Sequence, residues 1–237
     1  MFPNLVTYHI YRPTPSGDPP PASPAMNAGQ PPAYQYILAG NGLFVRAESR
    51  FWQACIPLAP CPVRGLPPLS TQFALKGNRL PGSVLCEVIR HAQQRRDADG
   101  RLVESLYRIC PRPDRTRIIW PAQTATAYSV TTTSDRPTGT LLELHSHGRL
   151  PAAWSPTDDR DEQGGCLYGV IGRLDGVPEI RLRLGIYGYW LPLALADLFD
   201  LDSSLPFPIR DLAERQAAAT QLTKTQLPRR NPDEAAS

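Results

Sequence analysis

Hydrophobic and polar positions alternate along much of the N-terminal third of the chain, and this period-two pattern predicts β-strands. The strand-like runs lie at residues 5–12, 34–39, 42–47 and 51–60. Gly40, Asn41 and Gly42 separate the second run from the third and tolerate the backbone angles of a tight turn, so we expect a hairpin there. Residues 12–32 are rich in proline and should form an extended loop or arm. We expect residues 1–78 to form a small proline-rich β region.

A helical period first appears after residue 80. Its apolar positions are Val84, Leu85, Val88, Ile89 and Ala92. This spacing predicts an amphipathic helix, and Pro81 suits its first turn. Strand-like runs follow at 101–109, 116–120, 127–133, 139–147, 166–172 and 179–191, with a short helix between the fourth and the fifth. Over residues 79–200 the order predicts an α/β fold, in which a mixed β-sheet is layered with helices.

The last part of the chain, residues 201–237, should form a C-terminal helix over 207–222 and a disordered tail. The chain has 237 residues, of which 41% are hydrophobic, so it can bury a substantial core. No run approaches the roughly 18 apolar residues of a membrane span, and the first residues lack the pattern of a secretory signal. We therefore expect a cytoplasmic protein with no membrane partner.

Charge and cysteine content exclude two further classes. The net charge of +3 is small, and the arginines between residues 90 and 117 are interleaved with acidic residues, so a nucleic-acid partner is not expected. The five cysteines are odd in number and scattered: Cys55, Cys61, Cys86, Cys110 and Cys166. Without a Cys-x-x-Cys pair they are best explained as buried free thiols, which suits a reducing compartment.

Two histidines share one face of the strand expected at 139–147. Side chains alternate across a strand, so Glu143, His145 and His147 point the same way. Gly148 then breaks the strand. Two imidazoles should therefore meet at its C-terminal end.

Residues 155–158, Ser-Pro-Thr-Asp, are typical of a helix start. Ser155 suits the N-cap position, Pro156 the first helical position and Asp158 the third. Taken alone, this stretch is explained by helix capping.

The two stretches together supply two imidazole nitrogens and one carboxylate. His145, His147 and Asp158 would be three protein ligands for Zn²⁺, with the fourth tetrahedral position left to water. Zn²⁺ lowers the pKa of such a water toward about 7 and polarises a substrate carbonyl. Asp159 is a fallback ligand, whereas the remaining acidic residues at 161 and 162 need no role beyond favouring the helix N-terminus.

The pattern His145-Ser146-His147, seven residues, Ser155, two residues and Asp158 resembles the signature of the JAMM (JAB/MPN+) metalloproteases, HSH-x7-S-x2-D. The resemblance implies a JAB/MPN-like, cytidine-deaminase-like core and a zinc-dependent isopeptidase or peptidase that acts on ubiquitin-like or sulfur-carrier-like tails. It further implies that the two histidines and the aspartate bind zinc, while Ser155 helps to stabilise the oxyanion. Gly148 departs from the proline that many members carry.

The family also uses an upstream glutamate as its general acid and base. Glu87, Glu104 and Glu143 are the candidates. Glu87 falls within the expected helix, and Glu143 adjoins His145 on one strand face. Glu104 fits best, because it begins a strand after the helix, 41 residues before His145. The residues after it, Ser-Leu-Tyr, depart from the small residues usual in the family.

A narrower resemblance involves the proline-rich N-terminal region, the stretch WPAQTATAYSV before the motif and YGVIGRLDG after it. These features are similar to the A proteins of bacterial PRTRC cassettes, which implies a ThiF/E1-like partner. The alternative function is a non-catalytic MPN-type scaffold or interaction protein that keeps the motif as a structural feature.

Overall fold

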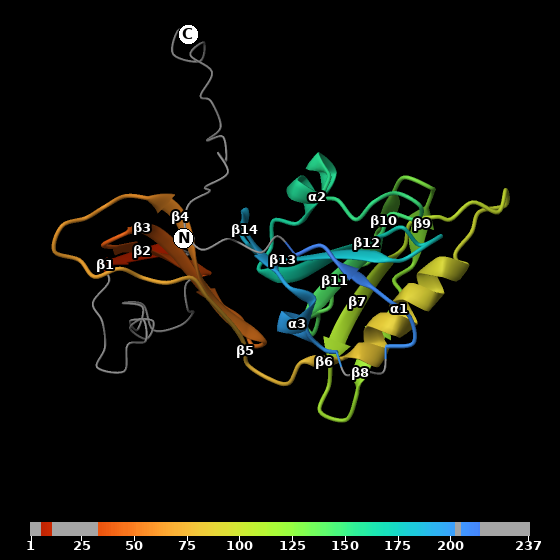
Figure 1. The fold of residues 1–237 in the computed structure, drawn as a ribbon, viewed down its shortest axis with the longest axis horizontal. Coiled ribbons are helices and arrows are strands. Elements are labelled where there is room, and N and C mark those ends of the chain that lie inside the picture. The colour runs from red at the N-terminus through yellow and green to blue at the C-terminus, as the bar shows by residue number, and fades with distance from the viewer. Residues whose placement is uncertain (1–5, 11–32, 202–204, 214–237) are drawn as a thin grey trace, which may run out of the picture.

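Two β-sheets, built from separate stretches of the chain, organise the computed structural model (Figure 1). The structure describes residues 6–10, 33–201 and 205–213. The N-terminal sheet has the order β1-β2-β3-β4-β5. Its strands are β1 (Val6–Ile10), β2 (Tyr34–Ala39), β3 (Gly42–Glu48), β4 (Trp52–Pro60) and β5 (Gln72–Leu75). β2 and β3 form the expected hairpin, in which Ala39 pairs with Gly42.

The central sheet has seven strands in the order β14-β13-β12-β11-β7-β8, with β16 beside β13. Its strands are β7 (Leu106–Pro111), β8 (Thr116–Ile119), β11 (Leu142–Ser146), β12 (Cys166–Gly172), β13 (Glu179–Ile186), β14 (Tyr189–Leu193) and β16 (Arg210–Asp211). β11 runs parallel to β12 and antiparallel to β7, so the sheet is mixed. Two small ladders lie outside it, formed by β9 (Gln123–Ala125) with β10 (Val130–Thr132) and by β6 (Leu80–Pro81) with β15 (Phe199–Asp200).

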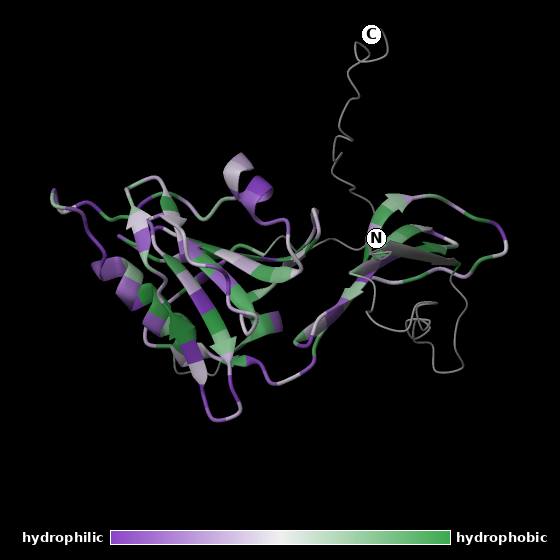
Figure 2. Ribbon diagram, turned by 180° about the vertical axis from the view of Figure 1, so that it is seen from behind, coloured by the Kyte–Doolittle hydropathy of each residue, from purple (hydrophilic) through white to green (hydrophobic). Residues whose placement is uncertain are grey.

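Helices α1 (Gly82–Gln94) and α2 (Pro156–Asp161) lie on opposite sides of the central sheet (Figure 1), and α3 (Leu195–Leu198) follows β14. α1 buries the apolar positions that its sequence period predicts, and its hydrophobic and hydrophilic faces are visible in Figure 2. The strand and helix content confirms an α/β fold that is rich in strands. None of the helices in the described part of the chain is long and apolar enough to cross a membrane.

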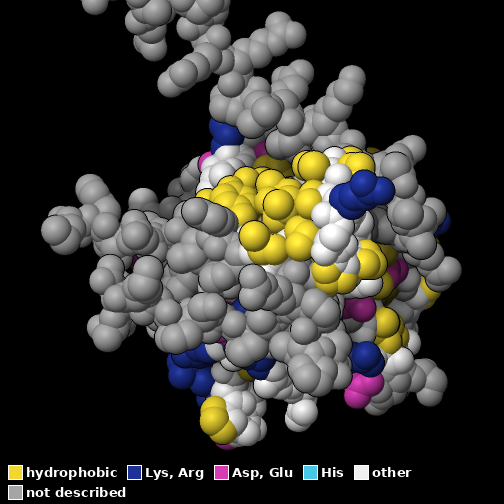
Figure 3. Space-filling model, turned by 90° about the vertical axis from the view of Figure 1, so that its left-hand side faces the viewer, with side chains coloured by type: hydrophobic (Ala, Val, Ile, Leu, Met, Phe, Trp, Pro, Cys, Tyr) yellow, Lys and Arg dark blue, Asp and Glu magenta, His cyan; other side chains and the backbone are white. Residues whose placement is uncertain are grey.

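The two sheets share one hydrophobic core. Val45, Trp52 and Ile56 of the N-terminal sheet belong to the same buried cluster as Leu144 and Leu184 of the central sheet. At the edge of this core, the hydroxyl groups of Tyr36 and Tyr189 lie 2.8 Å apart. Seen from the side of the N-terminal sheet, hydrophobic side chains form a patch on the surface (Figure 3).

Several boundaries differ from the sequence expectations. The strand expected at 101–109 begins only at Leu106, and the run at 179–191 is two strands, β13 and β14, separated by a turn in which Tyr187 and Gly188 have positive φ. The helix expected at 207–222 is wrong where the structure describes it, because Arg210–Asp211 pairs with β13 as a strand. Residues 214–237, with the expected tail, and the arm at 11–32 lie outside the described residues.

The cysteines are free thiols, as expected, and all but one are buried. Cys61 is the exposed one, because it follows β4 in the proline-rich connection and not within a strand.

Candidate metal centre

β11 places the two histidines in the middle of the central sheet. His145 lies opposite Val170 of β12 and Leu106 of β7. Leu142 and Leu144 pack in the core, so the alternation of the strand turns His145 toward the other face. His147 follows the strand, and its N–H donates to the carbonyl of Ile171 at 2.7 Å. This bond extends the pairing to β12 and fixes the second histidine.

A tight turn after His147 fixes the orientation of its ring. Gly148 has a φ of 53°, a left-handed conformation that glycine adopts without steric cost. The chain then turns back, so that Nδ1 of His147 lies 3.3 Å from the carbonyl oxygen of Pro151. A hydrogen bond from Nδ1–H to this carbonyl leaves the lone pair on Nε2 available to a metal.

Helix α2 supplies the carboxylate. Ser155 is its N-cap: its Oγ accepts from the N–H of Asp158 at 3.2 Å, and its own N–H donates to Oδ2 of Asp158 at 2.6 Å. The helix cap expected at Ser155 is therefore confirmed, and the two reciprocal hydrogen bonds make it a capping box. Oδ1 of Asp158 is directed elsewhere, 3.3 Å from Nε2 of His145. One carboxylate thus caps the helix with one oxygen and presents the other to the histidines.

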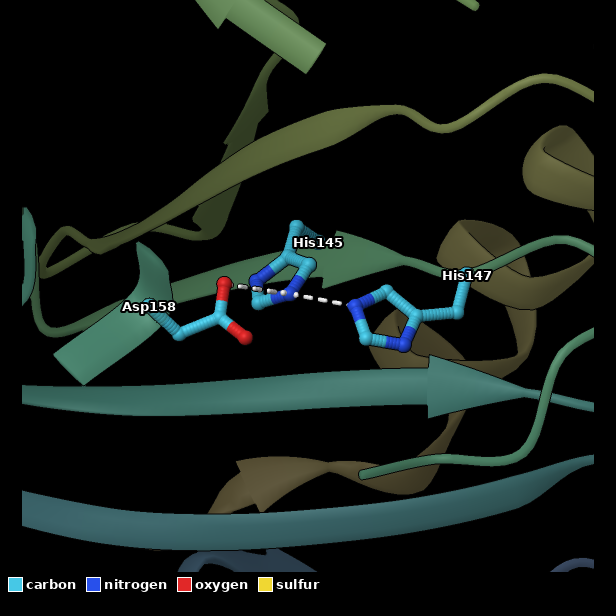
Figure 4. Close-up of side chains that lie close together, drawn as sticks. All are labelled: His145, His147 and Asp158. Atoms are coloured by element: carbon cyan, nitrogen blue, oxygen red, sulfur yellow. Dashed lines mark hydrogen bonds and ion pairs between the residues drawn. The ribbon is translucent and has the colours of Figure 1, made fainter. Parts of the chain in front are cut away.

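The three side chains converge (Figure 4). Nε2 of His145 lies 3.1 Å from Nε2 of His147, and one potential ligand atom from each of His145, His147 and Asp158 lies within 4.8 Å of the other two. Ligand atoms at Zn–N and Zn–O bond lengths around a tetrahedral ion are about 3.3 Å apart. The two measured separations are close to this value, so the residues fit a zinc ion or a similar divalent transition metal.

The environment keeps His145 neutral. Its side chain is 11% exposed. Burial lowers the pKa of His145 to about 4, with smaller contributions from His147 and Arg183, while the carboxylate of Asp158 opposes the shift. A neutral imidazole is the form that binds a metal.

Glu104 lies beside the three-residue cluster and not within it. It precedes β7, is 6% exposed, and its N–H donates to the carbonyl of Thr126 at 2.8 Å. Burial, followed by the negative charge of Asp158, raises the pKa of Glu104 to about 7. In the described part of the chain, its carboxylate makes no hydrogen bond. A buried carboxyl group with a pKa near neutrality suits proton transfer.

The other two glutamates lie elsewhere. Glu87 is exposed on α1. Glu143 shares the face of His145, but its Oε2 accepts from Nε of Arg108 at 2.9 Å. Of the three candidates, Glu104 is the one that is buried and whose carboxylate is not paired with an arginine.

Two of the acidic residues that follow Asp158 have other partners. Asp159, the fallback ligand, pairs through Oδ1 with Arg183 at 2.7 Å, and Oε2 of Glu162 accepts two hydrogen bonds from the same guanidinium. Asp161 is exposed. Sequence reasoning missed Arg183; its signal was an arginine in the middle of a β-rich run.

Comparisons with known proteins assign no family to the chain. No protein-family model matches the chain, and a search of the curated proteins finds no match. The resemblance to the JAMM signature therefore depends on the residues of the motif and on their arrangement.

Proposed function

We propose that the chain is a zinc-dependent isopeptidase or peptidase of the JAMM type, built on a JAB/MPN-like core. The observation that supports this most directly is the convergence of His145, His147 and Asp158, with separations of 3.1 and 3.3 Å between neighbouring ligand atoms. The separate oxygens of Asp158 support it further, because one is held by the cap and the other remains for a metal.

A zinc ion at this position would lower the pKa of a water molecule and polarise the carbonyl of the scissile bond. The residues of the chain would perform the remaining tasks. Glu104, with its raised pKa, would accept a proton from the attacking water and pass it to the leaving amine. Ser155 accepts one hydrogen bond through Oγ, so its hydroxyl proton remains free to stabilise the oxyanion.

The substrate that we propose is the flexible C-terminal tail of a ubiquitin-like or sulfur-carrier-like protein. Such a tail would bind in an extended form, as an added strand at a sheet edge. The ladder of β9 and β10 is next to Glu104, since Thr126 follows β9 and accepts the hydrogen bond from the N–H of Glu104. A tail paired with this ladder would lie close to the proposed base. A ThiF/E1-like protein of a bacterial PRTRC cassette is the partner that we propose.

Metal content tests the proposal. We expect about one zinc ion per chain after purification and zinc supplementation, and its loss in a His145→Ala, His147→Ala double variant.

Cleavage of a ubiquitin-like protein that carries a short C-terminal peptide extension, followed by mass spectrometry, tests catalysis. Glu104→Gln is the matched control, because it should retain zinc and lose cleavage. A folded chain that binds no zinc would favour the non-catalytic scaffold.

A further inference from the structure

We infer that Arg183 is the positioning residue of the metal centre. It holds α2 so that Asp158 faces the histidines, and it occupies the two neighbouring carboxylates that would otherwise compete for the ion. The inference rests on the proposed metal site and names a residue outside the motif.

Helix α2 lacks the usual means of attachment to a sheet. It has six residues, and none of them is buried. A helix this short gains little from its own hydrogen bonds, and its position is normally fixed by packing of an apolar face. Polar contacts must therefore determine where Asp158 lies.

Arg183 provides those contacts from the middle of β13. Its Nε and Nη2 donate to Oε2 of Glu162 at 2.8 and 2.6 Å, and its Nη1 donates to Oδ1 of Asp159 at 2.7 Å. Asp159 belongs to α2, and Glu162 is the C-cap of that helix. One guanidinium on a central strand thus binds two carboxylates of the segment that carries the third ligand.

The guanidinium is itself held rigidly. Arg183 is 5% exposed, and its Cζ lies 3.8 Å from the ring centroid of Trp154 and 4.9 Å from that of Trp190. Trp154 directly precedes the Ser155 cap, so the contact fixes the entry to α2 as well as its exit. A planar guanidinium can stack flat on a ring while its edge donates several hydrogen bonds in one plane, whereas a lysine ammonium is a compact point charge without a flat face.

The spacing along α2 explains why this attachment orients the ligand. Asp158 and Glu162 are four residues apart, on one side of the helix, and the N–H of Glu162 donates to the carbonyl of Asp158 at 2.9 Å. Because Arg183 binds both Asp159 and Glu162, the helical turn 158–162 that begins with Asp158 has little freedom to rotate. Because Arg183 also binds Oδ1 of Asp159, Asp158 remains the carboxylate that is available to the metal ion.

Cobalt and zinc binding by the full chain test the inference. The variants are Arg183→Lys, Arg183→Met and a charge-balanced Arg183→Met, Glu162→Met pair, which leaves no lone buried carboxylate if the single variant fails to fold. Arg108→Met is the matched control. Arg108 is equally buried and pairs with Glu143 on the same sheet, but it does not bind α2.

We expect each Arg183 variant to bind Zn²⁺ about ten-fold to a hundred-fold more weakly than the natural chain in chelator competition. The visible spectrum of the Co²⁺ form should lose intensity as the tetrahedral ligand set is broken, and amide hydrogen exchange across 156–161 should accelerate. Arg108→Met should leave all three unchanged.

The outcomes separate this inference from the proposed function. Unchanged zinc affinity and an unchanged Co²⁺ spectrum in the folded Arg183 variants would overturn the positioning role while the metal site stands. An equal loss in Arg108→Met would also overturn it, because the effect would then not pass through α2. A natural chain that binds neither metal would overturn both.

Discussion

Ser105 and Ser146 hydrogen bond to each other in both directions. The N–H of Ser105 donates to Oγ of Ser146 at 3.0 Å, and the N–H of Ser146 donates to the carbonyl of Ser105 at 2.9 Å. Ser146 lies between the two histidines, and Ser105 follows Glu104. This pair therefore joins the proposed base to the strand that carries the proposed ligands, and both serines are fully buried.

Replacing Ser146 with alanine removes the acceptor and leaves the buried N–H of Ser105 without a partner. We expect a loss of about 1 to 3 kcal/mol in the free energy of unfolding. Because Ser146 binds no metal, zinc content should be retained while cleavage falls. Urea unfolding and metal analysis measure the two effects. Ser134→Ala, at an exposed position, is the control and should change stability by less than about 0.5 kcal/mol.

Asp158 has two tasks that substitutions can separate. Asp158→Asn keeps one carbonyl oxygen for the N–H of Ser155 and removes the charged ligand, so the helix cap should survive while zinc affinity falls sharply. Ser155→Ala removes the reciprocal hydrogen bond at 3.2 Å and should cost about 1 kcal/mol of stability with zinc still bound. Thermal unfolding with and without zinc distinguishes them. Equal zinc affinity in the two variants would contradict the role of Asp158 as a ligand.

The local parts of the site could be predicted from the sequence, because they depend on short-range geometry. Alternation within a strand turned His145 and His147 to one side, and the capping pattern placed Ser155 and Asp158. The rest depends on contacts between distant segments. The strand expected from residue 101 begins only at Leu106, because the N–H of Glu104 binds the carbonyl of Thr126 beyond β9 and not a neighbouring strand.

The role of Arg183 was hidden for a similar reason. An arginine in an alternating strand is expected to face solvent, and only the folded chain shows that α2, Trp154 and Trp190 cover this face. Likewise, no local pattern reveals that the N-terminal sheet contributes Trp52 to the core of the central sheet.

The raised pKa of Glu104 predicts a pH-dependent cost to the metal-free protein. Below pH 4.5 both the folded and the unfolded states hold the proton. As the pH rises to about 7, the unfolded state loses its proton first, so the folded state becomes less stable. Glu104→Gln removes this cost and should stabilise the metal-free chain at about pH 8 by roughly 3 kcal/mol, with little effect near pH 4. Urea unfolding in a chelator measures it, with the exposed Glu87→Gln as the control.

His145 should have the opposite dependence in the same range. Its pKa falls from 6.5 to about 4 on folding, so between these values the unfolded state binds a proton that the folded state does not. Its contribution is constant above pH 6.5, and acidification below that value destabilises the folded state. Because Glu104 favours folding as the pH falls, the two groups partly cancel in the natural chain.

Single substitutions should expose each slope. Burial also raises the pKa of Glu162 to about 8, so its slope has the same direction as that of Glu104, and each variant is compared with the natural chain. Relative to that chain, metal-free Glu104→Gln should gain more stability at about pH 7 than at about pH 5. His145→Gln should lose stability as the pH rises from about pH 5 to about pH 7, through Glu104 and Glu162 together. The double variant should keep only the fall in stability with rising pH that Glu162 contributes, and urea unfolding across this range gives all three slopes. If both single variants had the slope of the natural chain, the two groups would not be buried together as the structure places them.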